Sequence, residues 1–171
     1  DVDGVLASKL GQYAENHFVG VNCGIMDQFA IAMGKAGHAV FLDTATLEYE
    51  YAPIDLAGYR IVIGNTNKVR RLEDSKYNER RSQCEAALAD IQTLMPVKAL
   101  GELTLDEFDL VAYAIKDPVN VRRARHAVSE NQRTLRAVKA LQNKDLTTFG
   151  RLMNASHVSL RDDYEVTGIE L

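Results

Sequence analysis

The chain has 171 residues, 46% of them apolar, and a formal net charge of −4 at pH 7. This length corresponds to roughly one domain, and the apolar fraction is enough for a buried core. Because the charge is negative and spread along the chain, general binding to nucleic acid or to an anionic membrane is not expected. No apolar run approaches the roughly 20 residues that a membrane-spanning helix needs.

The cysteines and the two ends of the sequence bear on where the protein works. Cys23 and Cys84 are the only cysteines, and they lie far apart, so they form neither a metal-binding spacing nor a disulfide framework. The acidic start, residues 1–5 (DVDGV), lacks the basic leader of a secretory signal peptide. We therefore expect a reducing, cytoplasmic compartment. Because the first residue is not Met, we also expect the chain to come from a longer protein.

Two helices are predicted near the start of the chain. Residues 5–14 read as the end of one helix, and residues 29–33 form a short helical pattern that Gly34 stops. Asp27 falls in the first turn of the second helix, just after Gly24. An acid at this position faces exposed backbone N–H groups and the positive end of the helix dipole. Such a carboxylate either favours the helix start or accepts a proton from a substrate hydroxyl.

Three strands are predicted next, at residues 38–43, 47–51 and 59–64. Apolar and charged residues alternate in the second of them, which is the period of a strand with one buried face, and Pro53 ends it. The third is short and rich in β-branched residues, and its continuous apolar stretch predicts burial on both faces.

The rest of the chain is predicted to be nearly all helix. Apolar spacing predicts a helix over residues 77–95, closed by Pro96, and a long amphipathic helix over residues 121–138. Thr104, followed by two acids, resembles the N-terminal cap of a short helix. Asp145 is expected to cap the last helix.

Charged residues in this helical part are expected to lie on solvated faces. The segment 68–81, which includes Arg80 and Arg81, mixes basic and acidic residues, and residues 122–130 carry three arginines and one glutamate. The run 161–164 (RDDY) receives no role beyond local ion pairing. The four histidines have no metal-ligand spacing.

Six short motifs occur in an order that resembles one family of small-molecule kinases. They are residues 14–16 (AEN), 18–20 (FVG), 23–28 (CGIMDQ), 65–67 (NTN), 75–81 (SKYNERR) and 159–165 (SLRDDYE). Together they resemble the galactokinase branch of the GHMP kinase family, from Leu10 to Glu165. The resemblance implies an α+β, two-lobed fold, with residues 1–60 in the N-terminal lobe and residues 61–171 in the mainly helical start of the C-terminal lobe.

The resemblance also implies an activity, the ATP-dependent phosphorylation of galactose at its C1 hydroxyl. It places the catalytic aspartate at Asp27, backbone and hydroxyl contacts to the sugar at Gly24 and Tyr77, and a ligand of the magnesium ion of Mg-ATP at Glu15. Phosphoryl transfer suits such residues because the protein mainly positions groups and neutralises charge. Magnesium takes hard oxygen ligands, so one glutamate with phosphate and water oxygens is a normal set.

Each of these assignments has a simpler alternative. Glu15 is also readable as a solvated acid at the end of a helix. Tyr77 lies on the apolar stripe of its predicted helix, where a phenol can pack its ring and still offer its hydroxyl. The oligomeric state and the role of residues 161–163 are not predicted.

Three parts of the galactokinase pattern do not appear in this sequence. They are the N-terminal sugar-binding motif, the glycine- and serine-rich loop that cradles the ATP phosphates, and a C-terminal glycine-rich motif. The eleven glycines never cluster. We therefore expect an internal fragment that is inactive by itself.

Two other functions fit the same resemblance. A galactokinase-like protein can sense sugar and ATP and regulate a partner, because function resides in the site rather than in the fold. A sister kinase acting on N-acetylgalactosamine is the second alternative, since specificity at C2 depends on pocket residues outside the recognised motifs.

Overall fold

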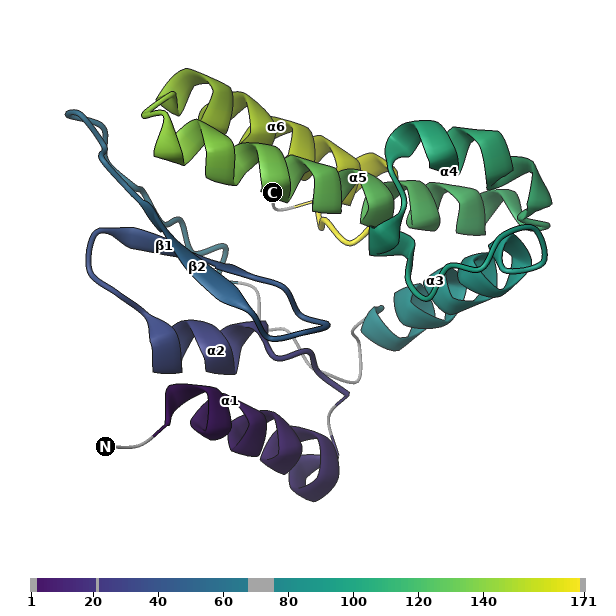
Figure 1. Ribbon diagram of the computed structural model, residues 1–171, viewed down its shortest axis with the longest axis horizontal. Helices are drawn as coiled ribbons and strands as arrows, with labels where there is room; N and C mark the ends of the chain where they lie inside the picture. Colours follow the sequence, from purple (N-terminus) through teal and green to yellow (C-terminus); the bar gives the residue numbers. More distant parts are fainter. Residues whose placement is uncertain (1–2, 21, 68–75, 170–171) are drawn as a thin grey trace. The chain divides into compact units, whose positions relative to one another are not determined.

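The computed structural model describes residues 3–20, 22–67 and 76–169 of the chain (Figure 1). Internal contacts divide the chain into two compact units. The first consists of Asp1–Arg60 with Ala140–Leu146, and the second of Ile61–Lys139 with Thr147–Leu171. The sequence did not predict that residues 140–146 would be grouped with the first unit. The assignment of residues 1–60 and 61–171 to two kinase lobes stays a prediction.

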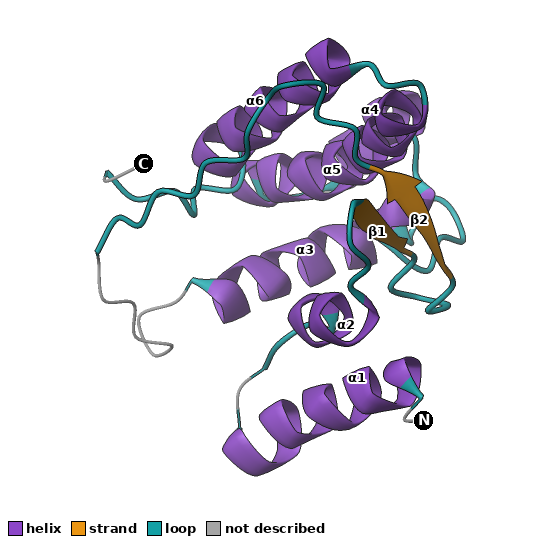
Figure 2. Ribbon diagram, turned by 90° about the vertical axis from the view of Figure 1, so that its left-hand side faces the viewer, coloured by secondary structure: helices purple, strands orange, loops and turns teal. Residues whose placement is uncertain are grey.

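The first unit contains helices and one β-hairpin. Its elements are α1 (Gly4–Tyr13), the π-helix η1 (Ala14–Val19), α2 (Met26–Met33), β1 (His38–Leu42) and β2 (Tyr49–Pro53). The strands pair antiparallel, with His38 opposite Pro53 and Leu42 opposite Tyr49, and they are drawn in orange in Figure 2. Both helices and the first two strands are confirmed, although β2 begins and ends two residues later than predicted.

Close packing joins α1 to α2. A Cβ atom added to Gly4 would meet the Met33 Sδ atom at 2.4 Å, and one added to Gly11 would meet the Gln28 Cγ atom at 3.1 Å. Only a residue without a side chain allows so close an approach at Gly4. The two glycines therefore set the distance between the helices.

The hairpin holds α2 from another direction. The Phe29 ring of α2 is buried and meets the Tyr49 ring edge-on, with 5.5 Å between ring centroids. The Tyr51 hydroxyl donates a hydrogen bond of 2.8 Å to the Met33 carbonyl. One helix is thus fixed by contacts with α1 and with both aromatic residues of β2.

The predicted third strand at residues 59–64 is wrong. These residues have no regular secondary structure, and Ile63 is 91% exposed, with Ile61 and Val62 similarly open. A strand forms only when its backbone pairs with a neighbour, and among the described residues the one sheet is the two-stranded ladder of β1 and β2. The apolar sequence shows strand propensity, which has no effect without a partner strand.

The second unit is helical. Its main helices are α3 (Tyr77–Ile91), α4 (Leu105–Val111), α5 (Pro118–Gln142) and α6 (Leu146–Asp162), with short 3-10 turns at Leu100–Glu102 and Ala112–Ala114. The last residues of α5 and the first of α6 belong to the first unit. The four predicted helices are confirmed, although α3 ends at Ile91, before Pro96. None of the helices described is both long enough and apolar enough to span a bilayer.

A single apolar core organises this unit. Its buried members come from α3, α4, α5 and the segments that join them: Ala87, Ile91, Val97, Leu100, Leu103, Phe108, Ile115, Ala124 and Val128. Ala124 and Val128 lie on the buried face of the amphipathic helix that the sequence predicts over residues 121–138. In α6, Leu152 is buried and Met153 is exposed.

The predicted cap at Thr104 is present as a full capping box. The Thr104 hydroxyl accepts a hydrogen bond of 3.2 Å from the Glu107 N–H, and the Glu107 carboxylate accepts one of 2.8 Å from the Thr104 N–H. The hydrogen bonds that the Thr104 N–H and hydroxyl donate to the Glu107 carboxylate hold the pKa of Glu107 below its ordinary value.

Removal of this cap tests how much the capping box contributes to the free energy of unfolding. Thr104→Ala is expected to lower the free energy of unfolding by about 1 kcal/mol, because a backbone N–H loses its side-chain acceptor. Urea denaturation of the 171-residue chain measures the change. Thr134→Ala is the matched control, since that exposed hydroxyl bonds only the Glu130 carbonyl inside α5. Equal loss in both variants would contradict the capping role.

Candidate active site

Asp27 is the second residue of α2, in its first turn, as predicted. The side chain is exposed, and its carboxylate forms no hydrogen bond or ion pair with any described residue. Ile25, two residues earlier, is buried and anchors the helix start. The structure therefore presents a carboxylate to solvent on a fixed backbone, which is the state that a proton acceptor requires.

Two side chains from the preceding elements fix the loop that leads into α2. The Asn16 Oδ1 atom accepts a hydrogen bond of 2.9 Å from the Cys23 N–H, and the Gln12 Nε2 atom donates one of 3.3 Å to the Cys23 carbonyl. Both backbone groups of Cys23 are thus satisfied from α1 and η1. Gly24 follows directly, so its backbone position depends on these two bonds.

Glu15 lies in the π-helix η1, next to Asn16. It is exposed, and its carboxylate has no partner among the described residues. The element ends at Gly20, whose φ of 81° is left-handed and whose N–H bonds the Glu15 carbonyl. Short π-helical segments are frequent at functional sites. The described residues contain no group of three or more His, Cys, Asp or Glu side chains that could hold a metal ion.

A pocket of about 420 Å³ lies beside the start of α2. Its walls are Lys9, Gln12, Gly24, Ile25, Met26, Thr44, Ala45 and Leu47. Gly24, a predicted sugar contact, is part of this wall, whereas Asp27 and Glu15 are not. The structure therefore brings Gly24 to a cavity and leaves Asp27 just beyond the last wall residue of α2.

Tyr77 belongs to the second unit, where it is the first residue of α3. Its side chain is 47% exposed, so the expectation that it packs in the core holds only for part of the ring. Burial is the main cause that raises the pKa of Tyr164, followed by the neighbouring Cys84, and the Tyr77 phenol adds a smaller electrostatic contribution. Tyr77 is thus partly open to a ligand.

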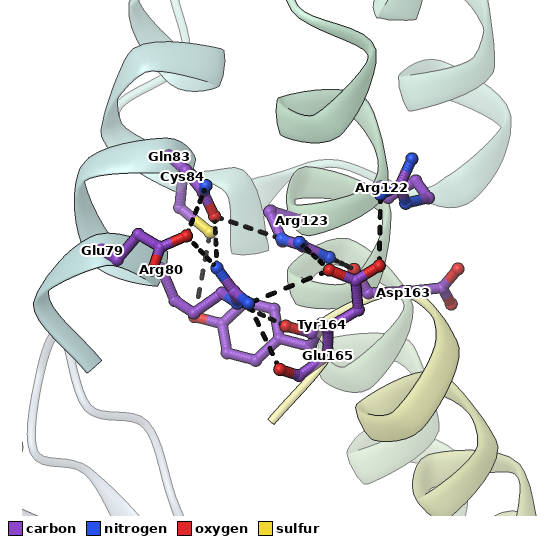
Figure 3. A network of polar contacts seen from close by, with 9 residues as sticks. All are labelled: Glu79, Arg80, Gln83, Cys84, Arg122, Arg123, Asp163, Tyr164 and Glu165. Atoms are coloured by element: carbon purple, nitrogen blue, oxygen red, sulfur yellow. Dashed lines mark hydrogen bonds and ion pairs between the residues drawn. The ribbon is translucent and has the colours of Figure 1, made fainter. Parts of the chain in front are cut away.

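Arg80, one turn after Tyr77, lies at the centre of a buried polar network (Figure 3). The residue is 1% exposed, so the predicted solvated face is wrong at this position. Its Nε atom donates to the Tyr164 carbonyl at 2.5 Å, and its Nη1 atom donates to the Glu79 and Gln83 side chains at 2.7 and 3.0 Å. The adjoining residues 68–75 of the predicted charged segment lie outside the described residues.

Arg123 of α5 is the second buried guanidinium, at 2% exposure, and it also contradicts the predicted polar face. Its Nε atom donates to the Gln83 Oε1 atom at 3.1 Å, and its Nη1 atom donates to the Asp163 carbonyl. Its Nη2 atom forms an ion pair of 2.5 Å with the Glu165 carboxylate. Buried charges persist only when they are paired and hydrogen-bonded, and both guanidiniums meet this condition.

Glu165 connects the cluster. Its carboxylate contacts Arg123, Arg122 at 3.3 Å and Arg80 at 3.9 Å. The hydrogen bond and charge of Arg123 are the main reasons that the pKa of Glu165 lies below its ordinary value. Its φ of 52° is left-handed, a conformation that usually carries glycine after a helix. The run 161–164 received no role from the sequence beyond local ion pairing, and its last two residues, together with Glu165, are acceptors for two buried arginines.

A second set of hydrogen bonds lies beside the network of Arg80, Arg123 and Glu165. The Ser159 hydroxyl donates to the Asp163 Oδ2 atom at 2.7 Å and lies 2.9 Å from the His126 Nδ1 atom. Because the Ser159 proton goes to Asp163, a neutral His126 with its proton on Nδ1 donates to the Ser159 oxygen. Its ring stacks on Tyr164, with centroids 4.3 Å apart, and Tyr164 in turn contacts the Cys84 sulfur.

Sequence reasoning missed Arg80, Arg123 and Glu165 because charge was equated with exposure. The spacing of Arg80 was available: it lies three residues after Tyr77 and four before Cys84, on the same helical stripe. A basic residue inside an apolar stripe indicates a buried, paired charge. The two units are described separately, so Tyr77 is not placed relative to Asp27, Gly24 and Glu15.

Comparisons with known proteins agree with one another. No family model matches the chain. It is 65% identical to a galactokinase from Clostridium beijerinckii over 163 residues, which are 95% of this chain and 42% of the relative. It is 60% identical to a galactokinase from Ligilactobacillus salivarius over all 171 residues, or 44% of that relative. The chain thus spans about two fifths of the length of the curated relatives it matches.

A solved structure gives the same result for the fold. The crystal structure of Lactococcus lactis galactokinase complexed with galactose matches with a TM-score of 0.95 at 51% identity, covering 100% of this chain and 44% of that one. The fold and the motifs are those of a GHMP kinase, in the form of a partial α+β structure. Within that class the chain is similar to part of the galactokinases over 95 to 100% of its own length.

The buried histidine gives a prediction for pH dependence. Burial is the main cause that lowers the pKa of His126 from its ordinary 6.5, with Glu130 and Asp163 opposing and Arg133 and Arg123 reinforcing the effect. The unfolded chain therefore binds a proton more readily than the folded one. The contribution of the neutral His126 to stability is fully present above its ordinary pKa of 6.5 and is lost as the pH falls below that value toward the lowered pKa of the folded state.

Thermal melting across this pH range measures the effect. His126→Gln is expected to flatten the fall in melting temperature, whereas His157→Gln, which changes an exposed histidine of α6, leaves it intact. An unchanged slope in His126→Gln would show that the pH dependence arises elsewhere.

Proposed function

We propose that the protein to which this chain belongs is a kinase that transfers the γ-phosphoryl group of Mg-ATP to the C1 hydroxyl of galactose. The observation that carries the proposal is the unpaired, exposed carboxylate of Asp27, set by α2 in a motif shared with galactokinases. The names of the relatives and the galactose complex of the matched structure support the choice of sugar.

Asp27 has a defined task in this reaction. Phosphoryl transfer runs through a loose transition state, so the protein contributes mostly position and charge. A carboxylate within hydrogen-bond reach of the sugar C1 hydroxyl orients that oxygen and takes its proton as the bond to phosphorus forms. The lack of a competing partner for Asp27 among the described residues leaves the carboxylate available for this proton.

Gly24 and Tyr77 are proposed to bind the sugar. Gly24 lines the pocket beside α2 and has no side chain to obstruct a backbone contact. Tyr77 is half exposed, and its hydroxyl is suited to a hydrogen bond with a sugar oxygen.

Glu15, the residue proposed to bind magnesium, has a side chain of the kind that this ion prefers. Glu15 is a free, exposed carboxylate, which is a hard oxygen ligand, and Mg²⁺ usually takes one or two carboxylates with phosphate and water oxygens. The bound ion would neutralise phosphate charge. We also propose a cytoplasmic location, which the free thiols of Cys23 and Cys84 support because a reducing compartment keeps cysteines unpaired.

Substitution of the carboxylate tests the proposal. In the full-length kinase, Asp27→Asn and Asp27→Ala are expected to lower kcat by orders of magnitude, because the C1 hydroxyl loses its proton acceptor, while the melting temperature stays close to that of the unsubstituted protein. Asp106→Asn is the matched control, since Asp106 is likewise the exposed second residue of a helix, α4. A near-normal rate in Asp27→Asn would remove Asp27 from the mechanism.

A substrate panel separates the alternatives. The full-length protein is expected to phosphorylate galactose faster than N-acetylgalactosamine, with ATP consumed in equal amount. Faster turnover of N-acetylgalactosamine would identify the sister kinase. Sugar and ATP binding without turnover would indicate a sensor.

The 171-residue chain alone is expected to give no measurable galactose 1-phosphate. It covers 44% of the matched galactokinase structure, and its sequence contains no glycine-rich run that could cradle ATP phosphates. Incubation of the purified chain with labelled ATP and galactose measures this. Sustained product formation would contradict the expectation.

A further inference from the structure

We propose that Arg80, held by Arg123 and Glu165, is the positioning residue for Tyr77, and that this buried arginine pair sets the affinity of the kinase for its sugar. The inference rests on the proposed function, because it assumes that the Tyr77 hydroxyl bonds galactose. It goes beyond that function by giving a task to three residues that do not touch the sugar.

The first step concerns how the start of α3 is held. From Tyr77 to Gln83, the first two turns of the helix, Arg80 is the one buried residue. The apolar core takes up α3 only from Cys84 onward, and its fully buried α3 residues are Ala87 and Ile91. The Lys76 side chain forms no capping bond. The position of Tyr77 therefore depends on the polar contacts of Arg80 rather than on apolar packing.

The second step concerns what those contacts reach. Arg80 Nε bonds the Tyr164 carbonyl at 2.5 Å, and its Nη2 atom bonds the Glu165 carbonyl at 3.2 Å. Two backbone groups of the segment after α6 thus accept from a side chain of α3 that lies 84 and 85 residues away in sequence. This places the Tyr164 phenol within electrostatic range of Tyr77.

The third step concerns why that segment is itself fixed. The Val166 N–H bonds the Leu160 carbonyl at 3.1 Å, which closes the end of α6 and holds Glu165 in its left-handed conformation. The Glu165 carboxylate then pairs with Arg123 of α5. Arg80 is therefore tied through one acidic residue to α5 and through two carbonyls to the end of α6.

The geometry requires a guanidinium. Arg80 serves four acceptors that lie in different directions: two side chains of α3 and two carbonyls after α6. An ammonium group is a compact point charge with three donors and cannot reproduce the planar fork. A lysine at this position keeps the charge and loses the geometry, which separates a positioning role from a purely electrostatic one.

Steady-state kinetics of the full-length kinase test the inference. Tyr77→Phe is expected to raise the KM for galactose by about tenfold, the value of one hydrogen bond, without changing the KM for ATP. Arg80→Lys is expected to raise the galactose KM by a similar factor with kcat nearly unchanged. The double variant is expected to match Tyr77→Phe alone, because Arg80 acts through the same hydroxyl.

Two further variants keep the experiment decisive. Glu165→Gln removes the ionic tie while leaving Arg80 in place, and it is expected to raise the galactose KM even if Arg80→Lys fails to fold. Arg161→Gln is the matched control, since Arg161 is 52% exposed and pairs only with its neighbour Asp162. It should leave both KM values unchanged.

Hydrogen exchange in the full-length kinase without ligands tests the same positioning. Glu165→Gln is expected to speed amide exchange at Arg80 and Arg81, the first amides of α3 with acceptors inside the helix, relative to Arg161→Gln, with exchange around Ile91 unaffected. An unchanged galactose KM in Arg80→Lys and Glu165→Gln, a multiplicative effect in the double variant, or unaltered exchange in the first turn of α3 would overturn the inference. Lack of galactose phosphorylation by the unsubstituted kinase would contradict the proposed function, while the exchange result still decides the positioning.

Discussion

Two guanidinium groups removed from water impose the strongest constraint on the helical unit. Arg80 and Arg123 are both almost fully buried, and neither charge is tolerable there without close acceptors. The chain supplies these acceptors from the Gln83 side chain and from the segment that ends α6. The path of residues 163–165 is therefore set by the need to satisfy two arginines. Polar contacts here define where helices end and how they meet, a task that apolar packing performs deeper in the unit.

The first unit holds a short helix, α2, in place while its Asp27 side chain stays exposed. Glycine contacts with α1 and aromatic contacts with β2 fix α2. Bonds from Gln12 and Asn16 then fix the loop before it. Asp27 gains a defined position without being buried, because every restraint acts on neighbouring residues. An exposed carboxylate on a rigid backbone is what a reaction at a bound hydroxyl requires.

Local sequence patterns predicted much of the fold. The helical spacing of α3 and α5, the capping box at Thr104 and the alternation in β2 depend on neighbours in sequence, so they are visible without a structure. Residues 59–64 failed because a strand needs a distant partner that no local pattern reports. The burial of Arg80 and Arg123 was missed partly for the same reason, since the carbonyls after α6 that accept from them lie 40 to 85 residues away. Asp27, Glu15, Gly24 and Tyr77 came from resemblance, and their roles stay predictions.

The left-handed backbone at Glu165 places two demands on one residue. Glycine would relieve the conformational cost, yet only an acidic side chain can join three arginines there. Removal of the carboxylate would leave two buried arginines without their shared anion, which costs about 3–5 kcal/mol, whereas the left-handed conformation of a residue with a side chain costs about 1–2 kcal/mol. Selection for heat resistance would therefore keep glutamate at this position, because the charges that it serves outweigh the backbone strain that it carries.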